Sequence, residues 1–167
     1  MATQTMTEKD WFLKKWDDEF QITRRVIAAV PQGKEDFKPA EKSRALRDLA
    51  FIFFGEEKVI EGAMSPGFMP QGPPPTPAVP VAELLKIYEQ SHPQVFDKVK
   101  ALPPDAFDRV MKFPVGPGQR ADVRYADVCW LMLNDAVHHR GQLSVYIRMV
   151  GGVVPPIYGP TLEVPWF

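Results

Sequence analysis

Cysteine is nearly absent from this sequence. The only one among its 167 residues is Cys129, so no disulfide can form within the chain. Cys129 falls on the apolar face of a predicted helix, where a thiol usually behaves as a small buried hydrophobe and not as a nucleophile. A single cysteine indicates a reducing compartment, and we therefore expect a cytoplasmic protein.

Long apolar runs and an excess of one charge are also missing. No window approaches the ~20 apolar residues that span a bilayer, and residues 1–9 are polar, without a stretch of the signal-peptide type. Lys and Arg total 20 against 21 Asp and Glu, so the net charge is -1 and no basic surface is available for phosphate backbones. We expect neither a membrane nor a nucleic acid as a partner.

The motifs of several common enzyme classes do not occur. The sequence has no Gly-rich phosphate loop, no nucleophile elbow and no CxxC pair. Histidine is scarce as well, with three in the chain. One of them, His92, precedes Pro93 at a predicted helix kink, and we interpret it as a solvated residue.

Apolar residues at helical spacing are abundant. Hydrophobic residues make up 45% of the chain, enough to fill the core of one domain over residues 1–167. Their recurrence at spacings of three, four and seven predicts four helices. The first begins after the cap Thr7 and ends before Pro31, and the others span Ser43–Met64, Pro80–Leu102 and Arg120–Met149. These helices predict an all-α bundle.

Proline interrupts this helical pattern in three places. The connection 65–80 is too rich in proline and glycine for regular structure, and long connections of this kind are often functional or mobile. A second segment, Pro103 to Gly118, holds four prolines and one short piece, Phe113-Pro114-Val115, that can be extended. The tail after Gly152 is predicted to be irregular, but it carries enough aromatic surface to pack against the rest of the protein.

The stretch 134–143 carries the most chemistry. Asp135 and His139 are four residues apart and therefore share one face of a helix, where they can grip one ion or each other. His139 lies on the apolar stripe, whereas His138 points roughly 100° away. Imidazole and carboxylate suit zinc, nickel, manganese or iron, but two ligands do not make a site. A hydrogen-bonded Asp–His pair that fixes the helix is the competing interpretation.

This stretch and the tail resemble the DinB/YfiT-like superfamily. The sequence HHRGQLSVYIRMVGGVVPPIYGP is similar to the last helix and ending of its members, and weaker similarity runs through Val30-Pro31, Phe37-Lys38-Pro39 and Leu46 to Glu57. The resemblance implies an up-down-down-up four-helix bundle, usually a homodimer. It also implies a divalent metal held by three histidines, one on the second helix and two on the last.

The implied metal site is incomplete in this chain. His139 matches one histidine of the last helix, Asp135 takes the place of the other, and the second-helix ligand falls on Ile52, which cannot coordinate a metal. Glu56, one turn later, could replace it if it faces inward. We expect a degenerate site that holds nickel, zinc or manganese weakly or not at all.

Two functions follow from the resemblance. In the first, the bundle pocket binds a small molecule or a partner without tight metal binding. In the alternative, the protein is a metal-dependent S-transferase for low-molecular-weight thiols or a related enzyme, with the metal on Asp135 and His139. Further candidates for the pocket lie near these ligands: His138, Arg140, Gln142, Phe53 and Glu57.

Overall fold

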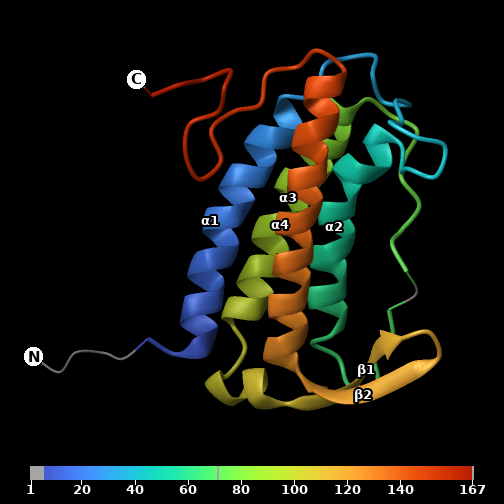
Figure 1. Cartoon of the computed structure of the whole chain (residues 1–167). Helices are drawn as coiled ribbons and strands as arrows, with labels where there is room; N and C mark the ends of the chain where they lie inside the picture. The colour runs from blue at the N-terminus through green and yellow to red at the C-terminus, as the bar shows by residue number, and fades with distance from the viewer. Residues whose placement is uncertain (1–5, 71, 167) are drawn as a thin grey trace, which may run out of the picture.

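The computed structural model describes residues 6–70 and 72–166, so the first five residues of the polar N-terminal segment lie outside it. Four α-helices form a bundle (Figure 1): α1 Glu8–Ala28, α2 Leu46–Gly62, α3 Val81–Lys100 and α4 Tyr125–Met149. In Figure 1, α1 and α4 run upward whereas α2 and α3 run downward, which is the expected up-down-down-up order. Helices α1 and α2 each pack against both α3 and α4.

A β-hairpin between α3 and α4 corrects the expectation of an all-α fold. A 3-10 helix comes first, and two antiparallel strands follow: η1 Pro104–Asp108, β1 Val110–Gly116 and β2 Gln119–Arg124. Gly118, with φ +68, supplies the left-handed residue of the turn. Met111 and Phe113 on β1 are buried and alternate with exposed neighbours, which is the period of a half-buried strand. Helix α4 begins at Tyr125 and not at Arg120, because residues 119–124 belong to β2.

The helix starts differ in how they are capped. Thr7 caps α1 as predicted and forms a capping box with Asp10. Helix α2 begins at Leu46 instead of near Ser43, and its N-cap residue, Ala45, makes no side-chain capping bond. The backbone amide of Leu46 donates instead to the carbonyl oxygen of Phe37 at 2.9 Å, so the preceding loop closes this helix end.

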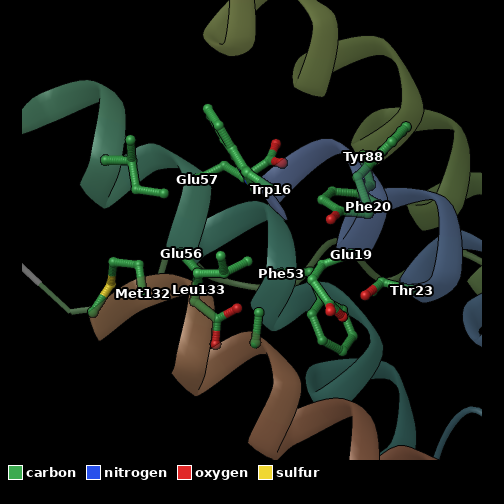
Figure 2. A pocket seen from close by; sticks show the side chains of 12 residues that line it. Trp16, Glu19, Phe20, Thr23, Phe53, Glu56, Glu57, Tyr88, Met132 and Leu133 are labelled. Atoms are coloured by element: carbon green, nitrogen blue, oxygen red, sulfur yellow. The ribbon is translucent and has the colours of Figure 1, made fainter. Parts of the chain in front are cut away.

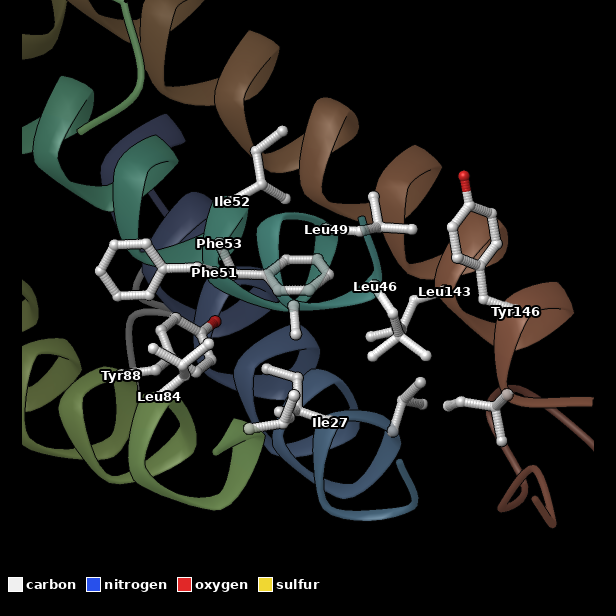
Figure 3. Packing of buried hydrophobic residues seen from close by; sticks show 14 of the residues in the cluster. Ile27, Leu46, Leu49, Phe51, Ile52, Phe53, Leu84, Tyr88, Leu143 and Tyr146 are labelled. Carbon is white, nitrogen blue, oxygen red and sulfur yellow. The ribbon is translucent and has the colours of Figure 1, made fainter. Parts of the chain in front are cut away.

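Buried hydrophobic side chains form two clusters along the bundle. One includes Phe53, Tyr88 and Leu143 and occupies the end where α2 and α3 begin (Figure 3). The other lies toward the hairpin and includes Tyr125 and Cys129. Cys129 is fully buried, as predicted, and burial raises the pKa of its thiol to about 12.

A layer of buried polar side chains separates the two clusters. It consists of Glu56 and Glu57 on α2, His92 on α3 and Arg140 on α4. Along its helix, each of these residues lies between members of one cluster and members of the other. Because a buried charge is costly without partners, this layer is the candidate location for a functional site.

The Pro-rich connection runs back along α2 to the start of α3 (Figure 1). It lies close to the helix at Gly55, where an added Cβ would come within 3.1 Å of Cδ of Pro74. In residues 6–70 and 72–166, none of the helices combines the length and the apolar character needed to cross a bilayer.

Candidate metal site

Three potential metal ligands from α2 and α4 converge at the polar layer. Nδ1 of His139 lies 2.9 Å from Oε1 of Glu56 and 3.6 Å from Oδ2 of Asp135. Asp135 and His139 stand one turn apart on α4, and Glu56 reaches them from α2. One ligand atom from each of the three residues lies within 4.8 Å of the other two. Glu56 therefore faces inward toward Asp135 and His139, which is the orientation it needs to replace Ile52 as the second-helix ligand.

Burial controls the charge of this cluster. The Glu56 side chain is only 7% exposed, and burial raises the pKa of its carboxyl to about 7, although the hydrogen bond with His139 opposes the shift. The same hydrogen bond raises the pKa of His139, helped by the nearby charge of Asp135 and opposed by burial and by Arg44. Oε2 of Glu56 is buried and has no hydrogen-bond partner among the described residues. Glu56 thus changes charge near neutral pH, and one of its carboxylate oxygens is buried without a hydrogen bond to any described residue.

A hollow of about 210 Å³ opens beside the three residues. Ile52 lines it one turn before Glu56, and Met132 lines it from α4. Pro70 and Pro73 of the Pro-rich connection form the facing wall. The connection therefore lies at the side of the candidate metal site, where it limits the shape of any molecule that enters.

A second buried acid–histidine pair crosses the polar layer toward α3. Nδ1 of His92 lies 2.5 Å from Oε1 of Glu57, and both side chains are almost fully buried. The His92 ring stacks on Phe20 with a centroid distance of 3.7 Å and an interplanar angle of 4°. The interpretation of His92 as a solvated residue is therefore wrong: Pro93 is accommodated inside α3, and His92 lies one turn from Tyr88 on the inner face of the helix. Burial raises the pKa of Glu57, and the bond to His92 opposes that shift.

The remaining pocket candidates lie in different places. Arg140 is buried, but its guanidinium faces α1, where Nη1 pairs with Oε2 of Glu19 at 2.6 Å. Its Nη2 donates to the hydroxyl of Tyr158 in the C-terminal tail at 2.5 Å. His138 and Gln142 are exposed, with His138 Nε2 and Gln142 Nε2 2.7 Å apart. Arg140 therefore ties the C-terminal tail to α1 and is not part of the candidate metal site.

Phe53 and Glu57 line a small central cavity that also reaches Glu56 (Figure 2). Its volume of about 10 Å³ provides room for roughly one water molecule. Oε2 of Glu57, like that of Glu56, has no protein partner among the described residues. The hollow beside His139, at about 210 Å³, is much larger and is therefore the candidate for a ligand.

Comparisons with known proteins agree with this architecture. The DinB family model matches residues 118–165, which contain Asp135, His139 and most of the tail but not α2. A DinB-like protein from Bacillus cereus ATCC 10987 aligns with a TM-score of 0.68 at 15% identity, over 88% of this chain and 95% of its own. The DinB-like protein YjoA from Bacillus subtilis aligns with a TM-score of 0.66 at 20% identity, over 89% of this chain and 97% of its own. None of the curated proteins matches the chain.

Proposed function

We propose that this chain, which matches the DinB family model over residues 118–165 and shares the fold of two DinB-like proteins, binds a divalent cation through Glu56, Asp135 and His139. The cation is presented to a small molecule in the hollow beside the Pro-rich connection. One observation carries this proposal: a buried carboxylate on α2 meets the Asp–His pair on α4, and one of its oxygens has no hydrogen-bond partner within residues 6–70 and 72–166.

The chemistry and spacing of the three groups suit a first-row divalent cation. Metal bonds of ~2.0–2.2 Å to nitrogen and oxygen place neighbouring ligand atoms roughly 3–3.5 Å apart. The distances from His139 to Glu56 and Asp135, 2.9 and 3.6 Å, lie close to that range. Ile52 cannot serve as the second-helix ligand that the resemblance implies, but Glu56 can supply a carboxylate from the next turn.

The affinity is expected to be modest. Asp135 is 44% exposed, so ordering its side chain costs entropy, and protons compete for Glu56. A cation held here would leave coordination positions open and could lower the pKa of a bound water or thiol.

Metal titration with matched variants tests this proposal. The metal-free protein is titrated with Zn²⁺, Ni²⁺ and Mn²⁺ by calorimetry, and elemental analysis follows dialysis. We expect one ion per chain for at least one of these metals, with binding lost in His139→Ala and Glu56→Gln but kept in His138→Ala. Binding that survives in Glu56→Gln, or no binding of any of the three metals, would overturn the proposal and favour a purely structural Asp–His–Glu cluster.

If no metal binds, the competing function is the binding of a small molecule in the hollow without a metal. The thiol S-transferase alternative rests on the resemblance alone, since nothing in the hollow favours sulfur over other donors. The homodimer and the cytoplasmic location likewise stay predictions.

A further inference from the structure

A basic residue borders the hollow of the candidate metal site. Arg44, which precedes α2, lines this hollow and also a neighbouring one of about 240 Å³. Its side chain is exposed and makes no ion pair or hydrogen bond with any described residue. Arg47, at the start of the same helix, is instead paired with Asp36 at 2.8 Å. Arg44 is therefore free to bind a ligand that reaches the hollow.

The walls around Arg44 are largely apolar. Ile52 and Pro73 are shared by both hollows, and Phe51 extends the apolar wall away from the candidate metal ligands. Asp48 lines only the neighbouring hollow, and it repels an anion placed there. Glu56 and Asp135 line the hollow of the candidate metal site, and a divalent cation bound there would offset their two negative charges. An anionic group is thus favoured on the side of Arg44 that faces Asp135 and His139 once the cation is bound.

On the premise of the cation site proposed above, we propose that its ligand is a small organic anion, selected by Arg44. A donor group of the ligand reaches the cation, an aliphatic or aromatic body lies against Ile52 and Pro73, and a carboxylate pairs with Arg44. The guanidinium suits this role because it stays charged and can make two parallel hydrogen bonds to a carboxylate. Arg44 thereby decides between anionic and neutral ligands of the same shape.

Two matched probes test this role. Adipic acid monohydroxamate carries a metal-binding hydroxamate and a carboxylate, and its carboxamide analogue differs only in lacking the charge. Each probe is titrated into Co²⁺-loaded protein, and the visible spectrum reports binding to the protein-held metal. The variant is Arg44→Gln, and the matched control is Arg47→Gln, which removes a positive charge that lines neither hollow.

We expect the carboxylate probe to bind about tenfold more tightly than the amide, as one added charge-assisted hydrogen bond provides. Arg44→Gln should abolish this preference while Co²⁺ still binds, and Arg47→Gln should keep it. Equal affinities in the unmodified protein, or a preference that survives in Arg44→Gln, would overturn the role of Arg44 and leave the cation site standing. If Co²⁺ does not bind at all, the proposed function fails and this inference fails with it.

Discussion

Removing the charge of Glu56 should stabilise the metal-free protein at alkaline pH. The folded-state pKa of Glu56 is raised from 4.5 to about 7, so ionising this carboxyl opposes folding. The sign follows from linkage: the native state binds the proton more tightly than the unfolded chain, so stability falls as pH rises from about 4.5 to 7. The shift corresponds to about 3 kcal/mol at pH 8 as an upper bound, at ~1.36 kcal/mol per pKa unit.

Glu56→Gln removes this cost and keeps an amide oxygen that can accept from Nδ1 of His139. For a domain of this size, about 1 kcal/mol moves the melting temperature by roughly 2–4 °C, so a rise of up to about 10 °C is expected at pH 8. Near pH 4 the variant and the unmodified protein should melt together. Asp135→Asn is the matched control, because the Asp135 carboxylate is 44% exposed and its removal should change stability little.

Differential scanning calorimetry between pH 4 and pH 8, with a chelator present, measures these shifts. Saturating Zn²⁺ should then reverse the order, since a ligand at ~1,000 times its Kd adds about 4.1 kcal/mol to the unmodified protein only. A variant that is less stable than the unmodified protein at pH 8 would refute the reasoning, because Glu56 would then be a structural partner of His139.

Three other changes test the packing of the polar layer and the binding of the cation. His92→Ala leaves the buried Glu57 carboxylate without its partner and should lower the free energy of unfolding, measured by urea denaturation, by about 3–5 kcal/mol. Metal affinity measured by calorimetry should hardly change. Arg140→Ala leaves Glu19 without its buried partner and should lower the free energy of unfolding by about 3–5 kcal/mol. The tail should then be cleaved faster by proteases. Arg140→Lys should not restore full stability. Zn²⁺ affinity should rise with pH through about 7, because the cation competes with the proton on Glu56, and a pH-independent affinity between pH 6 and 8 would exclude Glu56 as a ligand.

Periodicity predicted the four helices because each buries one stripe of apolar residues. The hairpin was missed because β2 has no buried residue and is largely polar, whereas β1 alternates buried and exposed side chains. The turn at Pro117-Gly118 was a usable signal, since a left-handed glycine between two short segments is typical of hairpins.

The candidate site was predictable in part for the same reason. Asp135 and His139 lie four apart on one helix, so their proximity follows from the sequence. The bond between His92 and Glu57 joins α3 to α2 and depends on tertiary packing, which no spacing within one helix reveals. His92 does stand at helical spacing from the buried Tyr88, and that spacing outweighs its position before a proline.

Anomalous diffraction from crystals soaked in Zn²⁺, collected on both sides of the zinc absorption edge, tests the central claim most directly. The account predicts one peak per chain within about 2.0–2.2 Å of a carboxylate oxygen of Glu56, a carboxylate oxygen of Asp135 and a ring nitrogen of His139. A peak elsewhere, for example on the exposed His138, or no peak between α2 and α4 at saturating Zn²⁺, would contradict it.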